Sequence, residues 1–251
     1  MRITVTRLRK GLAVALGSLV LLSASAWSKE KAKDSGQKMV DSGSFGVFNG
    51  SERVATETFS IHQGPEGSVI SSQFKSAQGA RNAEQSSELE LTSSGELRSY
   101  QWKEVAPETM AATIAPNDAF LVERYGSNPQ DKQQTQNFLL PPSTSILDDY
   151  FFVQREVLAW KYLATACKHD HGPVECPKQK VPFGTLNPHA RASASVSIEF
   201  TGREKLTVHG SARELSHFIL RSEMGDWGFW LDDQFKLVRL LDESGTEVVR
   251  D

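Results

Sequence analysis

The sequence predicts a mainly β protein: an antiparallel meander of about a dozen strands, curved like a half-barrel, with one central helix packed on its concave face. Three observations predict this fold class. Short runs of alternating apolar and polar side chains recur from Met39 onward, clusters of Gly, Pro, Asn and Ser separate them, and a single central segment has helical periodicity. The 251 residues, of which 39% are hydrophobic, are ample for one buried core. We therefore expect a single antiparallel β domain over residues 39–251.

The first 26 residues have the three parts of a secretory signal peptide. An apolar run over 12–22 follows a basic start and precedes the small residues Ala24-Ser25-Ala26, and it is about half the length needed to span a bilayer. We expect cleavage near Ala26 and export to the periplasm or the exterior, with 27–38 as a flexible leader. The basic residues of the start are Arg2, Arg7, Arg9 and Lys10.

The net charge of the chain argues against some classes of binding partner. The formal net charge is −3, and removal of the first 26 residues takes away four basic residues and no acidic ones. An acidic mature chain gives no electrostatic basis for binding nucleic acid or for peripheral attachment to a membrane with anionic lipid headgroups. The only cysteines, Cys167 and Cys176, lie far from the cleavage site, so anchoring through a lipidated N-terminal cysteine is excluded. The sequence thus predicts a protein that is not integral to a membrane.

The alternating runs supply the strands, taken in order along the chain. Asn49-Gly50 predicts a primed hairpin turn between the first two runs, because glycine adopts positive φ at no steric cost. In the second run Ala55, Glu57, Phe59 and Ile61 share one face, and the intervening side chains are mostly hydroxylic. The predicted strands cover residues 44–48, 53–62, 68–77, 84–92, 97–105, 109–114, 119–125, 132–139, 194–201, 204–209, 217–224, 228–231, 235–242 and 246–250.

The central segment predicts a helix over about 146–164. Pro141-Pro142 ends the first meander, and Ser145 followed by Asp148 resembles a capping box. Two adjacent i, i+4 rows of this segment are apolar, which makes a stripe wider than a surface helix needs. Two interpretations fit: the helix covers a packed sheet, or it closes over a cavity that holds a ligand.

The densest aromatic stretch lies near the C-terminus. Trp227, Phe229 and Leu231 share one face of the strand there, and Trp230 takes the other. Two apolar faces mean that both sides of this strand are covered, or that one side lines a cavity.

The cysteines predict a disulfide closing the loop 167–176, since the chain is predicted to enter an oxidising compartment. His169, Asp170, His171 and Glu175 in this loop are of metal-binding types, but no distant third ligand accompanies them, and we predict neither a metal nor a cofactor. Nucleophile-elbow, zinc-helix and phosphate-loop motifs are absent from the sequence. The acidic pairs Asp148/Asp149 and Asp232/Asp233 suit a helix start and a turn better than a glycosidase. We assign no catalytic residue and expect a binding protein rather than an enzyme.

Two stretches carry a family resemblance. The run Trp230-Leu-Asp-Asp-Gln-Phe-Lys-Leu-Val-Arg-Leu240 resembles the closing hairpin of a family of secreted bacterial β-sheet domains, and Gly43-Ser-Phe-Gly-Val-Phe-Asn-Gly50 resembles one of their early strands. Those domains resemble in turn the half-barrels of LolA-type periplasmic lipoprotein carriers. The resemblance implies a curved sheet that wraps a hydrophobic ligand beneath helices.

The leading hypothesis is therefore an exported, non-enzymatic protein that binds a lipid or another apolar component of the cell envelope. The alternatives are an envelope scaffold that binds another protein and has a fully packed core, and a metal-dependent hydrolase. The residues predicted to contact the apolar ligand are Phe59, Phe74, Trp102, Tyr150, Phe151, Leu158, Trp160, Tyr162 and Trp230.

Overall fold

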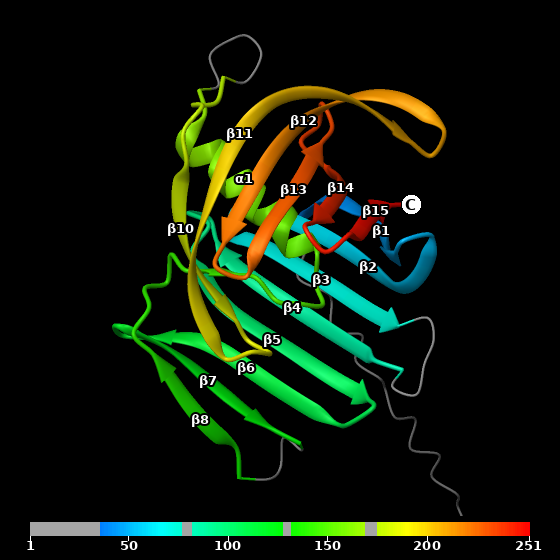
Figure 1. Ribbon diagram of the computed structural model, residues 1–251. Coiled ribbons are helices and arrows are strands. Elements are labelled where there is room, and N and C mark those ends of the chain that lie inside the picture. Colours follow the sequence, from blue (N-terminus) through cyan, green and yellow to red (C-terminus); the bar gives the residue numbers. More distant parts are fainter. Residues whose placement is uncertain (1–35, 77–81, 128–131, 169–174) are drawn as a thin grey trace, which may run out of the picture. The chain divides into compact units, whose positions relative to one another are not determined.

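The computed structural model describes residues 36–76, 82–127, 132–168 and 175–251, which lie in one compact unit. They form a single open, curved sheet of 15 strands with one helix (Figure 1). The mainly β, half-barrel-like fold with one helix is confirmed. The elements are β1 (Lys38–Asn49), β2 (Glu52–Gly64), β3 (Gly67–Ser76), β4 (Glu84–Thr92), β5 (Leu97–Ala106), β6 (Met110–Asn117), β7 (Phe120–Gly126), β8 (Gln134–Phe138), β9 (Ser145–Ile146), α1 (Val153–Ala166), β10 (Val181–Asn187), β11 (Ala192–Val208), β12 (Ser211–Ser222), β13 (Gly225–Leu231), β14 (Leu237–Asp242) and β15 (Thr246–Arg250).

The sheet consists of two meanders, which join where the first strand of the described chain pairs with the last. Strands β1 to β8 form one meander and β10 to β15 the other, and β1 pairs with β15 in the middle, with Phe45 opposite Arg250. All pairs are antiparallel except that of the two-residue strand β9 with β10. The predicted turn at Asn49-Gly50 is present, and Gly50 has φ 61°.

The second meander differs in detail from the prediction. Strand β11 runs unbroken through 192–208, where the sequence predicts two strands. Gly202, with φ 138° and a register shift beside it, forms a bulge within the strand rather than a turn. Strands β9 and β10 are not predicted, because β9 is short and Pro182 and Gly184 interrupt the alternation in β10.

The helix begins at Val153, so the predicted start at Ile146 is wrong. Residues 145–146 pair with β10 instead, and Asp148 does not cap the helix. The first helical N–H groups are satisfied by the Glu57 carboxylate of β2, which accepts from Phe152 N at 2.7 Å. Because the capping group comes from a distant strand, the local capping-box pattern of Ser145 and Asp148 predicts the wrong first residue for the helix.

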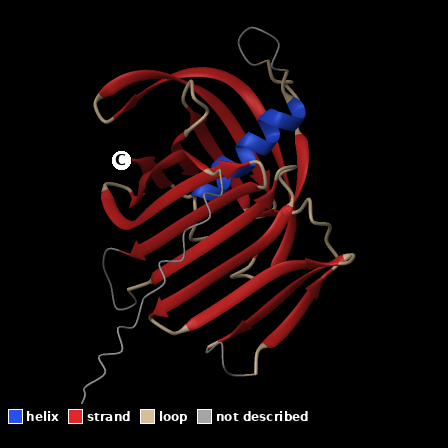
Figure 2. Ribbon diagram, turned by 180° about the vertical axis from the view of Figure 1, so that it is seen from behind, coloured by secondary structure: helices blue, strands red, loops and turns tan. Residues whose placement is uncertain are grey.

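Helix α1 lies on the concave side of the sheet, inside the curve of the strands (Figures 1 and 2). Its buried residues form one hydrophobic core with inward side chains of both meanders, Phe45 and Ile61 from the first and Phe218 and Leu240 from the second among them. The four residues predicted to share one face of β2, Ala55, Glu57, Phe59 and Ile61, are all buried.

A buried charge network fixes the helix where the two meanders meet. Arg250 donates to Asp41 at 2.6 Å and to Glu156 of α1 at 2.9 Å, and Leu237 N donates to Glu156 at 2.9 Å. Burial raises the pKa of Glu156 well above its usual value. Burial acts in the same direction on Asp41, but the hydrogen bonds with Arg250, Glu156 and Lys236 outweigh it and hold the Asp41 pKa at about 2. The network therefore couples the first strand, the helix and the last two strands.

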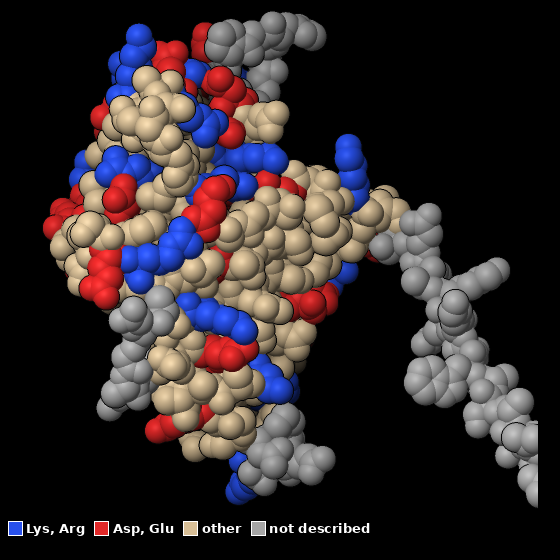
Figure 3. Space-filling model, turned by 90° about the vertical axis from the view of Figure 1, so that its right-hand side faces the viewer, with Lys and Arg blue, Asp and Glu red and all other residues tan. Residues whose placement is uncertain are grey.

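A second, smaller core lies on the opposite face of the second meander. It contains Trp230 with Val208, Leu215 and Val238, while Phe229 and Leu231 belong to the main core. Both faces of β13 are therefore covered, which is the first of the two alternatives that its sequence allows. On the face in Figure 3, Lys and Arg side chains are interspersed with Asp and Glu.

The Cys167–Cys176 disulfide is present. It follows α1, and backbone hydrogen bonds in both directions between Lys168 and Glu175 close the base of the loop. The predicted signal peptide, most of the predicted leader and His169, Asp170 and His171 lie outside the described residues, although Lys38 already belongs to β1. Among the helices of the described ranges, none has the length and apolar character to cross a membrane.

Candidate functional site

One side of α1 leaves a cavity of about 380 Å³ between the helix and the sheet. Its sheet wall comes from β2, β3 and β4, and its outer rim from the turn between β4 and β5 and the segment leading into β9. We call it the helix pocket. Its apolar wall consists of Ile61, Ile70, Leu89, Leu91, Ile146, Val157, Leu158, Trp160 and Ala164.

The strand register builds the apolar floor of the helix pocket. Ile61 of β2 pairs with Ile70 of β3, and Ile70 pairs with Leu89 of β4, so three aliphatic side chains form one row across the inward face. Gly67 lets β3 approach β4 at the rim, because a Cβ atom there would lie 1.9 Å from the Leu91 carbonyl oxygen. A side chain at position 67 would therefore push the two strands apart.

Two side-chain contacts hold the helix over this floor. Glu57, fully buried, accepts from the N–H groups of Phe152 and Val153 and from Ser72 Oγ, the last at 2.6 Å. Burial raises the pKa of Glu57 to about 7 despite these donors. Trp160 Nε1 donates to the carbonyl of Phe235 at 2.6 Å, which fixes the indole at the pocket wall. These hydrogen bonds therefore fix the position of the helix that forms one wall of the pocket.

The rim of the helix pocket is polar. The hydroxyl groups of Thr92, Ser93, Ser94, Thr144, Ser145 and Thr165 line it, with Lys161 of α1. A concave, mostly apolar surface with a few polar groups at one end is the usual form of a small-molecule site. An apolar chain could be covered there while a polar end group stays near solvent.

The predicted ligand residues divide among several surroundings. Leu158 and Trp160 line the helix pocket, whereas Phe151 and Tyr162 are fully buried in the packed core. Phe59, Phe74 and Trp102 face inward from β2, β3 and β5, and Tyr150 packs edge-on against Phe74 with ring centres 5.3 Å apart. Trp230 lies in the second core, apart from the other eight.

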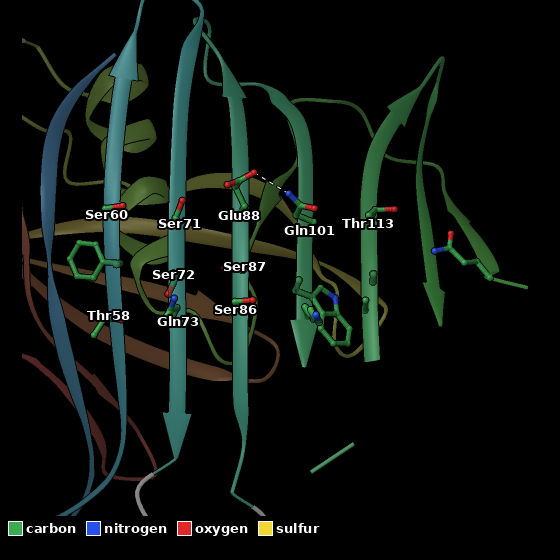
Figure 4. A pocket seen from close by; sticks show the side chains of 16 residues that line it. Thr58, Ser60, Ser71, Ser72, Gln73, Ser86, Ser87, Glu88, Gln101 and Thr113 are labelled. Carbon is green, nitrogen blue, oxygen red and sulfur yellow. Dashed lines mark hydrogen bonds between the residues drawn. The ribbon is translucent and has the colours of Figure 1, made fainter. Parts of the chain in front are cut away.

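A second hollow lies on the outward face of β2 to β6 and has a volume of about 750 Å³. We call it the outer trough. Figure 4 shows two cross-strand rows of small polar side chains along its floor, and Glu88 accepts from Gln101 at 3.0 Å within one of them. These rows are hydrophilic, but two of the predicted ligand residues, Phe59 and Trp102, also line the trough, together with Ala111 and Ala112. The rows are Ser60, Ser71, Glu88, Gln101 and Thr113, and Thr58, Gln73 and Ser86.

A cluster of buried polar groups fastens the turn between β10 and β11 to β5. His189 Nδ1 lies 2.7 Å from a carboxylate oxygen of the fully buried Asp148, which also accepts from Tyr100 Oη at 2.7 Å. The His189 ring stacks on Trp102 with centres 3.9 Å apart, and Tyr150 covers it at 4.7 Å. Among the described residues, neither Asp148 nor His189 lines the helix pocket or the outer trough. The contacts assign the pair to holding the turn, not to the helix start that the sequence suggests for Asp148.

The described residues contain no group of three or more His, Cys, Asp or Glu side chains placed to hold a metal ion. Comparison with known proteins adds no identification: no family model, no curated protein and no solved structure matches the chain.

Sequence reasoning missed most of the helix pocket. It identified Leu158 and Trp160 but neither Lys161 nor Thr144, and it did not select the aliphatic row of the sheet. Alternation placed Ile61 on the same face of its strand as Phe59. Only the register between strands shows which aliphatic side chains lie beneath the helix.

Proposed function

We propose that the protein binds the hydrocarbon part of a small amphiphile in the helix pocket. The observation that carries the proposal is the cavity of about 380 Å³ between α1 and the sheet, with an apolar wall and a polar rim. Its volume is within the range of about 300–1,000 Å³ that small-molecule sites occupy.

Burial of apolar surface favours an alkyl chain as the ligand of the helix pocket. Each Å² of apolar ligand surface removed from water contributes about 25 cal/mol, so an alkyl chain gains more from the pocket than a polar ligand does. Phe151 and Tyr162 are completely buried in the packed core, so the polar rim of the helix pocket is the route for a ligand. The ligand therefore enters at the edge facing the turn between β4 and β5.

The proposed setting is the cell envelope. The signal-peptide pattern of 1–26 predicts export, and the disulfide Cys167–Cys176 agrees with an oxidising compartment. The resemblance to LolA-type carriers favours a lipid-like envelope component as the ligand. The curved sheet with a helix on its concave face supports the same hypothesis.

An uncharged, polarity-sensitive dye, N-phenyl-1-naphthylamine, tests the proposal. The substitution Ala164→Trp places a large side chain at the exposed helix position that lines the pocket. We expect dye fluorescence to rise on binding to the unmodified protein and the dissociation constant to increase at least tenfold in Ala164→Trp. Ala119→Trp, an exposed position in the turn before β7, is the matched control and should bind the dye normally.

Two results would contradict the proposal: an unmodified protein that does not bind the dye, or equal binding by both tryptophan variants. The first result would favour the envelope scaffold with a packed core, and the second would place the dye at another surface.

A further inference from the structure

The helix pocket contains a single ionisable side chain. Among the described residues that line it, Lys161 is the only one with a charge at neutral pH, and no Asp, Glu, Arg or His accompanies it. An apolar cavity with one cation at its rim is electrostatically suited to a ligand with an anionic end group.

No acidic side chain of the described residues forms an ion pair with Lys161. Its Nζ donates to the carbonyl oxygen of Ser143 and to Ser145 Oγ, both uncharged acceptors, and forms no ion pair within the described part of the chain. Burial lowers the Lys161 pKa, and Glu96 acts on it only through a longer-range attraction. An ammonium group has three N–H donors, and the described residues accept from two of them.

A second polar group at the same rim has an unmet hydrogen bond. Thr144 is 4% exposed and lines the pocket, and its Oγ1 has no hydrogen-bond partner among the described residues. A buried hydroxyl without a partner costs free energy that a bound acceptor would recover. Thr144 lies between Ser143 and Ser145, the two residues that accept from Lys161, so its hydroxyl group and the Lys161 ammonium group lie at the same part of the rim.

We propose that the ligand of the helix pocket is a single-chain amphiphile with an anionic head group, a carboxylate or a phosphate, which Lys161 and Thr144 bind while its alkyl chain lies under α1. This inference rests on the proposed function and specifies the class of its ligand. A charge-assisted hydrogen bond from the ammonium group is about twice as strong as one between neutral groups, which gives preference for the anion over an alcohol of the same length.

Displacement of the uncharged dye by four amphiphiles that share a dodecyl chain tests the inference. Dodecanoate, dodecyl phosphate, dodecanol and dodecyltrimethylammonium are compared below their critical micelle concentrations. We expect at least one anion to displace the dye at a tenfold lower concentration than dodecanol, and the cation to be the weakest of the four. Which anion is preferred identifies the head group.

The variant Lys161→Met retains most of the alkyl stem and removes the charge. It should bind the dye and dodecanol normally and lose the preference for the anion. Lys103→Met, which removes a charge from the outer trough, should keep that preference. Thr144→Val should weaken it partially, and circular dichroism confirms that each variant is folded.

Equal displacement by dodecanoate, dodecyl phosphate and dodecanol in the unmodified protein would overturn the inference, and so would an anion preference that survives in Lys161→Met. Dye binding would still support the pocket in either case. Failure of the dye itself to bind would instead refute the proposed function.

Discussion

Replacement of Glu57 by glutamine should stabilise the protein at alkaline pH, although Glu57 caps the helix. The carboxyl group is fully buried, and burial raises its pKa from 4.5 to about 7. The folded protein therefore retains a proton that the unfolded chain releases, so stability falls as the pH rises from 4.5 through 7. The pKa difference corresponds to a loss of about 3 kcal/mol when the carboxyl group is fully ionised.

Glutamine reproduces the protonated form of Glu57. Its amide oxygen can accept from Phe152 N, and its NH₂ group can donate to Ser72 Oγ, whose hydroxyl hydrogen rotates. At pH 4 we expect the unfolding free energies of Glu57→Gln and the unmodified protein to agree within about 1 kcal/mol. At pH 8.5 the unfolding free energy of Glu57→Gln should be higher by up to about 3 kcal/mol.

Urea unfolding followed by tryptophan fluorescence at the two pH values measures this difference. Glu52→Gln, an exposed position on the same strand, serves as the control and should not change the pH dependence. The reasoning is refuted if the difference in unfolding free energy between Glu57→Gln and the unmodified protein is the same at pH 4 and pH 8.5.

Three further predictions concern other parts of the fold. Burial also raises the pKa of Glu123 to about 7, so Glu123→Gln should reduce the loss of stability between pH 5 and 8 in urea titrations, and an unchanged loss would contradict this. Replacing Cys167 and Cys176 with serine should lower the unfolding free energy by about 2–3 kcal/mol, because the disulfide closes a short loop, and two free thiols in the unmodified protein would refute the bond. Phe151→Ala should cost about 3–5 kcal/mol, whereas Val157→Ala at the pocket wall should cost about 1 kcal/mol, and a Val157→Ala cost of about 2 kcal/mol or more, as for a fully buried valine, would mean that the pocket is packed.

Local patterns predicted the strands well. Period-two alternation identified which side chains of β2 share a face, and Asn49-Gly50 marked its turn, because both signals act between neighbours in the chain. The disulfide was predictable from the cysteine count and the expected compartment. Each of these inferences needs only a few consecutive residues or the composition.

The helix start and the pocket depend on distant residues. Asp148 resembles a capping residue, but the helix is capped by Glu57, 95 positions before Phe152. The role of Glu57 could not be read locally, since an acidic residue in a strand usually faces solvent. Lys161 likewise looks like an ordinary polar residue of an amphipathic helix until the sheet places aliphatic side chains beneath it. Sequence reasoning therefore predicted a helix over a concave sheet without locating the cavity.

The central claim is that an alkyl chain lies between α1 and the sheet, and the most direct measurement is crystallography with 12-bromododecanoate. The anomalous signal of bromine locates the end of the chain independently of any assumption about the ligand. We predict a bromine peak enclosed by Ile70, Leu89 and Val157. A peak in the outer trough, or none in the helix pocket at saturating ligand, would contradict the account.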